Sequence, residues 1–203
     1  MHILFVCTGN VCRSPMGELL TRRYLAHTSV DVSSAGTHGL DAHPIDPSGK
    51  RLMDSLGIDS SMFRSRQLTA AMAGEADLIL CFEHDQVQEI VAIAPDAIRR
   101  TFLLTEFAAM CLYCARNGMV KGSTLQERLA SVVGVAAFVR PMVPPSRDIA
   151  DPFGKDFPAF RTAAEQTNKA VWLMLDSMRK HYGDATGLEA RTRAWVMGNA
   201  AAG

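Results

Sequence analysis

The sequence has no excess charge of either sign, since 21 lysine and arginine residues balance 21 aspartate and glutamate residues. This balance gives no reason to expect nucleic acid or an anionic membrane as a partner. The chain also lacks a run of the ~18 apolar residues that a membrane span requires. Its amino-terminal residues lack the basic and then apolar pattern of a secretory signal. We therefore expect a cytoplasmic protein.

Cysteine is scarce as well, with five residues in a chain of 203. An odd number of cysteines, in a chain long enough to bury a core, argues against a disulfide framework. We expect reduced thiols, one or two of them with a chemical role. The six histidines show no spacing typical of metal ligands, and we expect neither a metal nor another cofactor.

The length fits a single domain, which we place at residues 1–182. Within it, residues 107–147 form a long stretch with Pro141, Pro144 and Pro145, which we interpret as a helical insertion followed by a loop. This insertion either shapes the access of a substrate or partner or is a solvent-facing addition. Residues 183–203 are rich in glycine and alanine, and we expect a C-terminal extension that is frayed or weakly helical.

Apolar runs of strand length lie at residues 2–6 and 78–82, further strand candidates lie at residues 30–34 and 100–104, and helical patterns alternate with them. This alternation predicts parallel βαβ units, so we expect an α/β fold with an open parallel sheet covered on both faces. Ligands in such folds bind at the carboxyl ends of the strands. The loop after the first strand is therefore the favoured place for a site.

Local signals predict where the helices begin and end. Ser14-Pro15 opens the first helix, Asp46-Pro47 opens a second that ends at Gly57, and Thr105 caps a helix after the fourth strand. A last helix is expected from about residue 158 to 181. Apolar spacing predicts these buried faces: Met16, Leu19, Leu20 and Tyr24 in the first helix, and Phe160, Ala164, Thr167, Val171, Leu175 and Met178 in the last.

The loop after the first strand reads Cys7-Thr8-Gly9-Asn10-Val11-Cys12-Arg13-Ser14, with a cysteine at the strand end and an arginine at the mouth of a helix. The backbone N–H groups of a curled loop can face inward, and the helix adds the positive end of its dipole. Such a loop binds a phosphate dianion without a metal. Arg13 presents a planar fork to two phosphate oxygens. We predict that residues 8–14 bind phosphate.

The same field acts on Cys7, because a helix N-terminus and a nearby arginine favour the thiolate. A thiolate in line with phosphorus can form a phosphocysteine, which water then hydrolyses. Ser14 can donate a hydrogen bond to the sulfur. The alternative is a buried strand-end thiol beside a solvated arginine. The combination of strand, Gly-Asn loop, Arg-Ser-Pro and helix favours the phosphate loop.

A phenolate leaving group must be protonated as it departs, and a carboxylic acid is the usual donor. Asp151 precedes Pro152 in a loop before the last helix and is the best-placed carboxyl group. Asp-Pro also simply marks turns, and Asp46-Pro47 is a second copy that a helix start explains. From the residues alone, Asp151 is either the general acid or a turn residue.

These segments resemble the low-molecular-weight protein tyrosine phosphatase family. The match begins with residues 5–15 and continues, in the family's order, with residues 34–37, 64–69, 76–80 and 151–154. It covers about residues 1–105 and 148–180. The cysteine precedes the acid in this chain, whereas the acid loop comes first in the larger tyrosine phosphatases.

The resemblance implies a three-layer α/β/α fold of flavodoxin-like type with a four-stranded parallel sheet, as in phosphotyrosine protein phosphatase I. It implies a protein tyrosine phosphatase with Cys7 as nucleophile, Arg13 as phosphate clamp and Asp151 as acid and then base. The implied partners are a phosphotyrosine-containing protein substrate and a cognate tyrosine kinase, and the chain is expected to be a monomer or weak dimer.

The resemblance also assigns supporting residues. Asn10, Ser14 and Ser34 are expected to form a hydrogen-bond network that holds the loop. Cys12 is expected to pair with Cys7 under oxidation, which would protect the nucleophile reversibly. A small residue that packs the loop is the alternative interpretation of Cys12.

Three residues depart from the family's pattern. Leu40 stands where many members carry an aromatic residue that walls the pocket. The loss of that aromatic ring weakens stacking on a phenyl ester by roughly 0.5–1.5 kcal/mol. Phe63 stands where some relatives have a histidine that supports the loop. Phe153 replaces the first of two tyrosines after Asp151-Pro152 and can flank an aromatic substrate. Leu40 and Phe153 are thus the expected pocket walls.

Two other functions share the loop. Arsenate reductases resemble it but add two closely spaced cysteines after the third strand; Cys81 lies near that place, and residue 88 is a glutamine. Cys111 and Cys114 share a helix face with Phe107 and are expected to be core thiols. A non-catalytic phosphate- or phosphotyrosine-binding module needs neither nucleophile nor acid, so the presence of both favours an enzyme.

Overall fold

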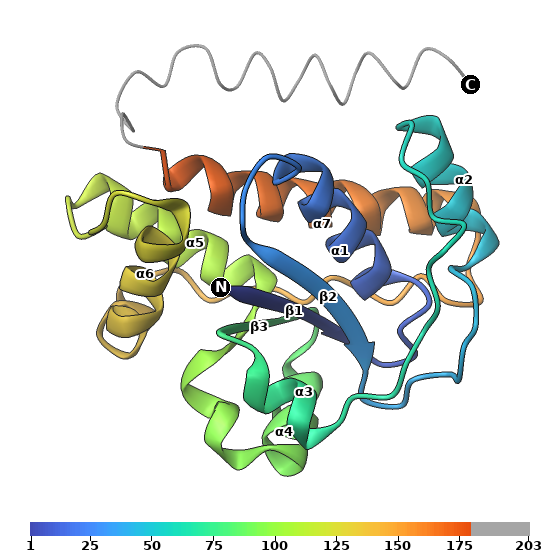
Figure 1. Ribbon diagram of the computed structural model, residues 1–203, viewed down its shortest axis with the longest axis horizontal. Coiled ribbons are helices and arrows are strands. Elements are labelled where there is room, and N and C mark those ends of the chain that lie inside the picture. The colour runs from blue at the N-terminus through green and yellow to red at the C-terminus, as the bar shows by residue number, and fades with distance from the viewer. Residues whose placement is uncertain (180–203) are drawn as a thin grey trace.

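The computed structural model describes residues 1–179. Its strands and helices alternate along the chain (Figure 1). In order, they are β1 (His2–Cys7), α1 (Arg13–Tyr24), β2 (Asp31–Gly36), α2 (Pro47–Ser55), α3 (Ala70–Glu75), β3 (Leu78–Cys81), α4 (His84–Ile93), the 3-10 helix η1 (Pro95–Arg100), β4 (Thr101–Leu103), α5 (Leu104–Arg116), α6 (Leu125–Val139), the 3-10 helix η2 (Arg140–Met142) and α7 (Phe157–Ser177).

The four strands form one parallel sheet in the order β2-β1-β3-β4. Strand β1 lies between β2 and β3, so that Cys7 is opposite Gly36 and Val6 is opposite Cys81. The strand order reverses at β1, and the loops that follow β1 and β3 therefore diverge at the carboxyl edge of the sheet. The predicted three-layer, flavodoxin-like fold is confirmed.

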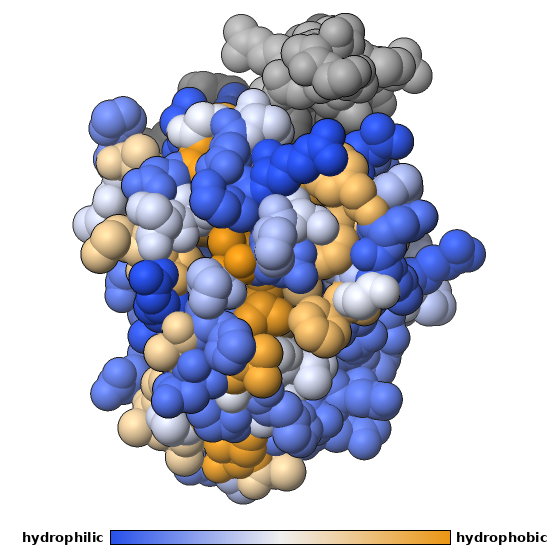
Figure 2. Space-filling view, turned by 90° about the vertical axis from the view of Figure 1, so that its right-hand side faces the viewer, coloured by the Kyte–Doolittle hydropathy of each residue, from blue (hydrophilic) through white to orange (hydrophobic). Residues whose placement is uncertain are grey.

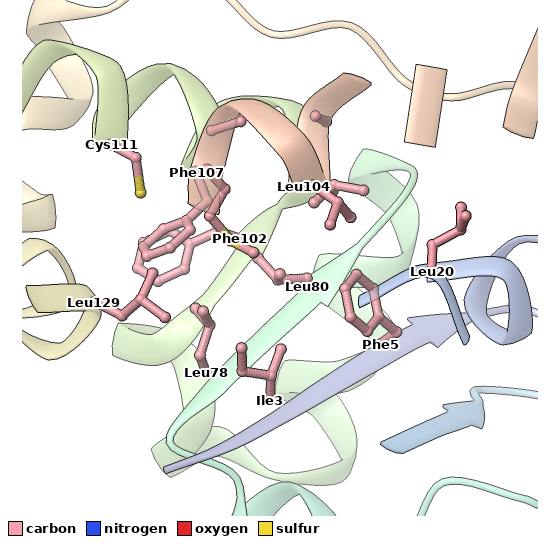
Figure 3. Packing of buried hydrophobic residues seen from close by; sticks show 14 of the residues in the cluster. Ile3, Phe5, Leu20, Leu78, Leu80, Phe102, Leu104, Phe107, Cys111 and Leu129 are labelled. Atoms are coloured by element: carbon pink, nitrogen blue, oxygen red, sulfur yellow. The ribbon is translucent and has the colours of Figure 1, made fainter. Parts of the chain in front are cut away.

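Side chains of the strands alternate between two covering layers. Ile3, Phe5 and Leu80 face the layer of α1, α5 and α7, whereas Leu4 and Val6 face α3, α4 and η1 (Figure 1). Figure 3 shows the first layer from close by, where Phe102 lies against Phe107 of α5 on one side of Leu80 and Phe5 lies next to Leu20 of α1 on the other. Helices packed on both faces fix the strands, and with them the carboxyl ends that carry the loops.

Two details differ from the sequence prediction. Thr105 does not cap α5, because β4 passes directly into the helix at Leu104; its hydroxyl donates instead to the Arg147 carbonyl at 2.9 Å. Tyr24 is 41% exposed, because it is the last residue of α1 and its hydroxyl reaches Asn168 on α7 at 2.8 Å.

The ends of the last helix can be compared only in part. Helix α7 begins at Phe157, one residue before the predicted start, where the Asp156 side chain accepts the Ala159 N–H. It ends at Ser177, and residue 181, the predicted end, lies outside the described residues, as does the predicted extension at 183–203. Short helix α3 was not predicted; Thr69 caps it by accepting the Met72 N–H.

Helix α6 packs against α5, at the left of Figure 1. Arg128 of α6 donates to the carbonyls of Met178 and Arg179, at 2.6 and 3.0 Å, and so attaches α6 to the end of α7. The boundaries of the insertion at 107–147 stay a prediction. None of the helices described in residues 1–179 is long and apolar enough to cross a membrane.

Candidate active site

The loop between β1 and α1 turns its carbonyl groups outward. Four of them accept backbone N–H groups at 2.9–3.2 Å, from Thr37 to Cys7, His38 to Thr8, Leu40 to Gly9 and Asp46 to Val11. Within the described residues, the N–H groups of residues 8–12 have no such backbone acceptor. An outward carbonyl turns the N–H of the same peptide unit inward, so these donors converge in an anion-binding concavity.

Two residues allow the loop to take this shape. Asn10 has a φ of 54°, in the left-handed region that asparagine tolerates better than most residues. A Cβ on Gly36 would lie 2.4 Å from the Thr8 carbonyl oxygen and 3.0 Å from the Asn10 nitrogen. Only glycine at position 36 lets strand β2 lie directly against the loop.

Cys7 is buried at the start of this loop, with its Sγ 3.0 Å from the Ser14 hydroxyl. Asn10 donates through Nδ2 to both Ser14 and Ser34, at 2.8 Å each, and its Oδ1 accepts the Arg66 N–H at 2.9 Å. Because Asn10 supplies a proton to Ser14, Ser14 keeps its own proton to donate, with the sulfur at 3.0 Å and the Ala35 carbonyl at 3.3 Å as the two acceptors. The structure thus brings together the three predicted supporting residues, Asn10, Ser14 and Ser34.

Arg13 is 1% exposed and lies between two carboxylates. Its Nη1 is 2.8 Å from Glu83 Oε2 and donates to the Ile149 carbonyl at 2.9 Å, while its Nη2 is 2.8 Å from Asp151 Oδ2. The Arg13 Nε has no hydrogen-bond partner in residues 1–179. The guanidinium is therefore anchored through Nη1 and keeps the Nε edge for another acceptor.

The loop that carries Asp151 is held at the same place. The Ile149 N–H donates to the Phe82 carbonyl at 2.9 Å, and Asp151 Oδ1 accepts the Phe153 N–H at 3.1 Å. Asp151 therefore projects its Oδ2 toward Arg13 with a side chain 40% exposed. Asp46, the second Asp-Pro copy, instead caps α2 by accepting the Ser48 N–H.

The two expected pocket walls are exposed. Leu40 is 40% and Phe153 is 59% exposed, beside the Cys7 loop and the Asp151 loop respectively. Figure 2 views the molecule from the side where β1 and β2 end in Figure 1, and apolar residues gather near the middle of this face among hydrophilic ones. Such a surface suits a substrate with an aromatic group next to a charged one.

The remaining thiols are buried and free. Burial, with Asp46 as the next cause, raises the pKa of the Cys12 thiol, and burial also raises the pKa of Cys81 and Cys111. Cys12 packs with Val11 and Phe160, so its packing role is visible, and its pairing with Cys7 stays a prediction. Cys111 and Cys114 are core thiols, as predicted. In residues 1–179 no three histidine, cysteine, aspartate or glutamate side chains form a group that could hold a metal ion.

Sequence reasoning found Asp151 but missed two other partners of Arg13, Glu83 and the Ile149 carbonyl. Glu83 lies two residues after the end of β3, at the carboxyl edge where polar residues serve ligands, and this position was the available signal. Gln86 donates to Glu83 Oε2 at 2.8 Å and accepts the Phe82 N–H at 2.9 Å, so it holds Glu83 in place. The contact to Ile149 uses its backbone carbonyl, so the identity of the residue at position 149 could not indicate it.

The fold and this loop define a class of protein by what they can bind. Converging N–H donors at a topological switch point form a site for a phosphate-like anion, and a thiol and a buried arginine lie beside it. Phosphatases of the α/β class have such a site.

The model of the family "Low molecular weight phosphotyrosine protein phosphatase" matches residues 2–117. The protein-tyrosine-phosphatase Etp of Escherichia coli (strain K12) is 43% identical over 105 residues, 52% of this chain and 70% of that protein. The probable protein-tyrosine-phosphatase EpsP of Ralstonia nicotianae is 34% identical over 169 residues, 83% of this chain and 90% of that protein. This chain belongs to the low-molecular-weight protein tyrosine phosphatase family.

Solved structures agree with this assignment. The tyrosine phosphatase Wzb from Escherichia coli K30, in complex with sulphate, superposes with a TM-score of 0.65 at 26% identity and covers 88% of this chain and 98% of that one. The YwlE arginine phosphatase from Geobacillus stearothermophilus gives a TM-score of 0.65 at 26% identity, over 87% and 92% of the two chains. The protein is therefore a phosphatase by family and fold.

Proposed function

We propose that this protein hydrolyses phosphotyrosine in protein substrates through a phosphocysteine intermediate on Cys7. One observation carries the proposal: the carbonyls of Cys7, Thr8, Gly9 and Val11 accept bonds from outside the loop, which leaves the N–H groups of the same peptide units on the inner side, next to the buried Cys7 thiol. A ring of N–H donors and a helix N-terminus bind a tetrahedral dianion. The Nε edge of Arg13 supplies the charged part of the same site.

In the first step, the Cys7 thiolate attacks phosphorus while the phosphate oxygens rest on the loop N–H groups and on Arg13. The S–P bond forms and the bond from phosphorus to the phenolic oxygen breaks. Asp151 gives its proton to that oxygen, so tyrosine leaves as a neutral phenol. Asp151 suits this role because its Oδ2 lies 2.8 Å from Arg13 Nη2, beside the expected phosphate.

In the second step, a water molecule attacks the phosphorus of the phosphocysteine. The Asp151 carboxylate now takes a proton from the water, the S–P bond breaks, and inorganic phosphate leaves. The Ser14 hydroxyl, 3.0 Å from Sγ, stabilises the thiolate as nucleophile in the first step and as leaving group in the second.

The proposed substrate is an aromatic phosphate ester on a protein. Leu40 and Phe153 are exposed apolar side chains beside the two loops, and they suit a phenyl ring that follows the phosphate into the site. The relatives Etp and EpsP carry the name protein-tyrosine-phosphatase, which supports this substrate class. A tyrosine kinase that makes the substrate, and a cytoplasmic location, are parts of the same proposal.

Steady-state hydrolysis of para-nitrophenyl phosphate tests the proposal, with Cys7→Ser beside the wild type. We expect Cys7→Ser to lose all activity. Cys114→Ser, a matched change of a buried thiol outside the loop, should keep the wild-type activity. Activity in a folded Cys7→Ser variant would refute the mechanism.

A comparison of substrates tests the chemical class. A phosphotyrosine peptide should be hydrolysed with a higher kcat/KM than a phosphoarginine peptide of the same sequence, and arsenate with a thiol donor should not be reduced. Preference for phosphoarginine would reassign the substrate and leave the nucleophile in place.

A further inference from the structure

A carboxylate is buried behind the loop. Glu18 lies one turn after Ser14 on α1 and is 5% exposed. Its Oε2 accepts the Ser34 hydroxyl at 2.6 Å, and its Oε1 is 3.0 Å from Arg22 Nη2. Burial raises the pKa of Glu18, whereas Ser34, Arg22 and Arg66 lower it and Asp31 raises it further. A buried ion pair is a weak source of stability, so the position of Glu18 asks for another explanation.

The donors and acceptors around Glu18 fix the direction of each proton. Arg22 has only donors, so Glu18 Oε1 must accept from it. Ser34 has one proton and already accepts an N–H of Asn10, so its proton goes to Glu18 Oε2. Ser34 thereby presents a lone pair to Asn10.

The second N–H of Asn10 then reaches Ser14. The Ser14 hydroxyl lies 3.0 Å from Cys7 Sγ and 3.3 Å from the Ala35 carbonyl oxygen, so its own proton has the sulfur as the nearer of two acceptors. The four contacts form a chain of hydrogen bonds that runs from Glu18 through Ser34, Asn10 and Ser14 to the sulfur. We propose that Glu18 is a positioning residue for Cys7: it holds the Ser34 proton away from Asn10, so that Asn10 and Ser14 keep the orientation that serves the thiolate. This inference rests on the proposed role of Cys7 as nucleophile.

The variant Glu18→Gln separates this role from simple filling of space. Arg22 would draw the amide oxygen of the new side chain, because that oxygen is its one acceptor there. The amide NH₂ would then face Ser34 and could not accept the Ser34 proton. That proton would turn toward Asn10, against the N–H that Asn10 donates to Ser34. Loss of one hydrogen bond to a charged group predicts a fall in kcat of about tenfold.

Removing Arg22 should reverse the effect. With Arg22→Met, the amide of Glu18→Gln is free to turn its oxygen to Ser34 and restore the chain. We therefore expect Glu18→Gln to lower kcat about tenfold beside Arg22, and less than about twofold in the Arg22→Met background. Comparison within each background cancels the loss of the Arg22 hydrogen bond to the Val32 carbonyl, which both Arg22→Met proteins share.

The measurement is kcat for para-nitrophenyl phosphate in the wild type, the two single variants and the double variant. Glu165→Gln is the matched control, since Glu165 is an exposed glutamate 3.7 Å from an arginine four residues away, and it should leave kcat unchanged. Equal losses in both backgrounds, or no loss in either, would overturn the inference.

Two further results keep the outcomes apart. If the urea unfolding midpoint of Glu18→Gln shows that this variant does not fold, Glu18→Asp replaces it. The aspartate side chain keeps the charge but is too short to reach both Ser34 and Arg22. Unchanged kcat in Glu18→Asp would overturn the inference. Cys7→Ser is assayed in parallel. Activity there would refute the nucleophile itself, whereas a dead Cys7→Ser beside a fully active Glu18→Gln would refute only the role of Glu18.

Discussion

The replacement of Arg13 by lysine tests the phosphate clamp. Lysine keeps the positive charge but has no planar fork. Nη1 of Arg13 is engaged by Glu83 and by the Ile149 carbonyl, so the phosphate is left with Nε and Nη2. An ammonium group cannot fill both sets of contacts, and two hydrogen bonds between charged groups are lost to the anion. At ~1.5–3 kcal/mol each, the loss is about 3–6 kcal/mol, or about 10²–10⁴ in kcat/KM.

Steady-state kinetics with para-nitrophenyl phosphate measure this loss, and the inhibition constant of inorganic phosphate reports the part that affects the ground state. Arg51→Lys is the control, because the exposed Arg51 lies 4.2 Å from the centre of the Phe157 ring and contacts neither loop carboxylate. It should keep nearly full activity. An Arg13→Lys variant with more than about a tenth of the wild-type kcat/KM would refute the reasoning.

Three further predictions concern the acid, the loop and a buried charge. Asp151→Asn should lower kcat/KM by about 10²–10⁴ for phenyl phosphate and much less for para-nitrophenyl phosphate, whose leaving group needs no proton; kcat/KM is compared because it excludes the second step, which both substrates share, and equal losses would count against the acid. Gly36→Ala should lower the free energy of unfolding by about 1–3 kcal/mol and reduce kcat, because its Cβ would meet the Thr8 carbonyl, whereas Gly74→Ala, with open space around it, should do neither. Burial raises the pKa of Glu18 above its unfolded value, so the native state holds the carboxyl proton to a higher pH than the unfolded state does. The contribution of Glu18 to the free energy of unfolding is therefore full below about pH 4.3 and falls as the pH rises through the folded pKa. Urea titrations from acid to neutral pH should show this fall in the wild type and a flatter curve in Glu18→Gln; parallel curves would contradict it.

The parts of the fold that could be predicted have local causes. All four residues of β3 are buried, and a strand buried on both faces reads as an unbroken apolar run. The Cys7 loop is likewise continuous in the sequence, so its cysteine, its turn residues and its arginine could be recognised together. The second strand and the second helix, with its Asp46 cap and its end before Gly57, followed from similar signals.

The parts that could not be predicted depend on which distant segments meet. Glu83 and the Ile149 carbonyl contact Arg13 only because the loops after β3 and before α7 converge at the carboxyl edge. Thr105 carries a genuine capping signal, but the end of β4 places it inside the first turn of α5. Glu18 stands one turn after Ser14, a spacing that the sequence does show, yet an isolated glutamate on a helix is usually solvent-exposed.

The central claim is that Cys7 carries the phosphoryl group between the two steps. Rapid denaturation of the enzyme during turnover of an aryl phosphate, followed by peptide mapping by mass spectrometry, tests this claim most directly. A phosphoryl group on the peptide that contains Cys7, absent from the same peptide of Cys7→Ala, is the expected result. A phosphoryl group on any other side chain, or turnover that persists in Cys7→Ala, would contradict it.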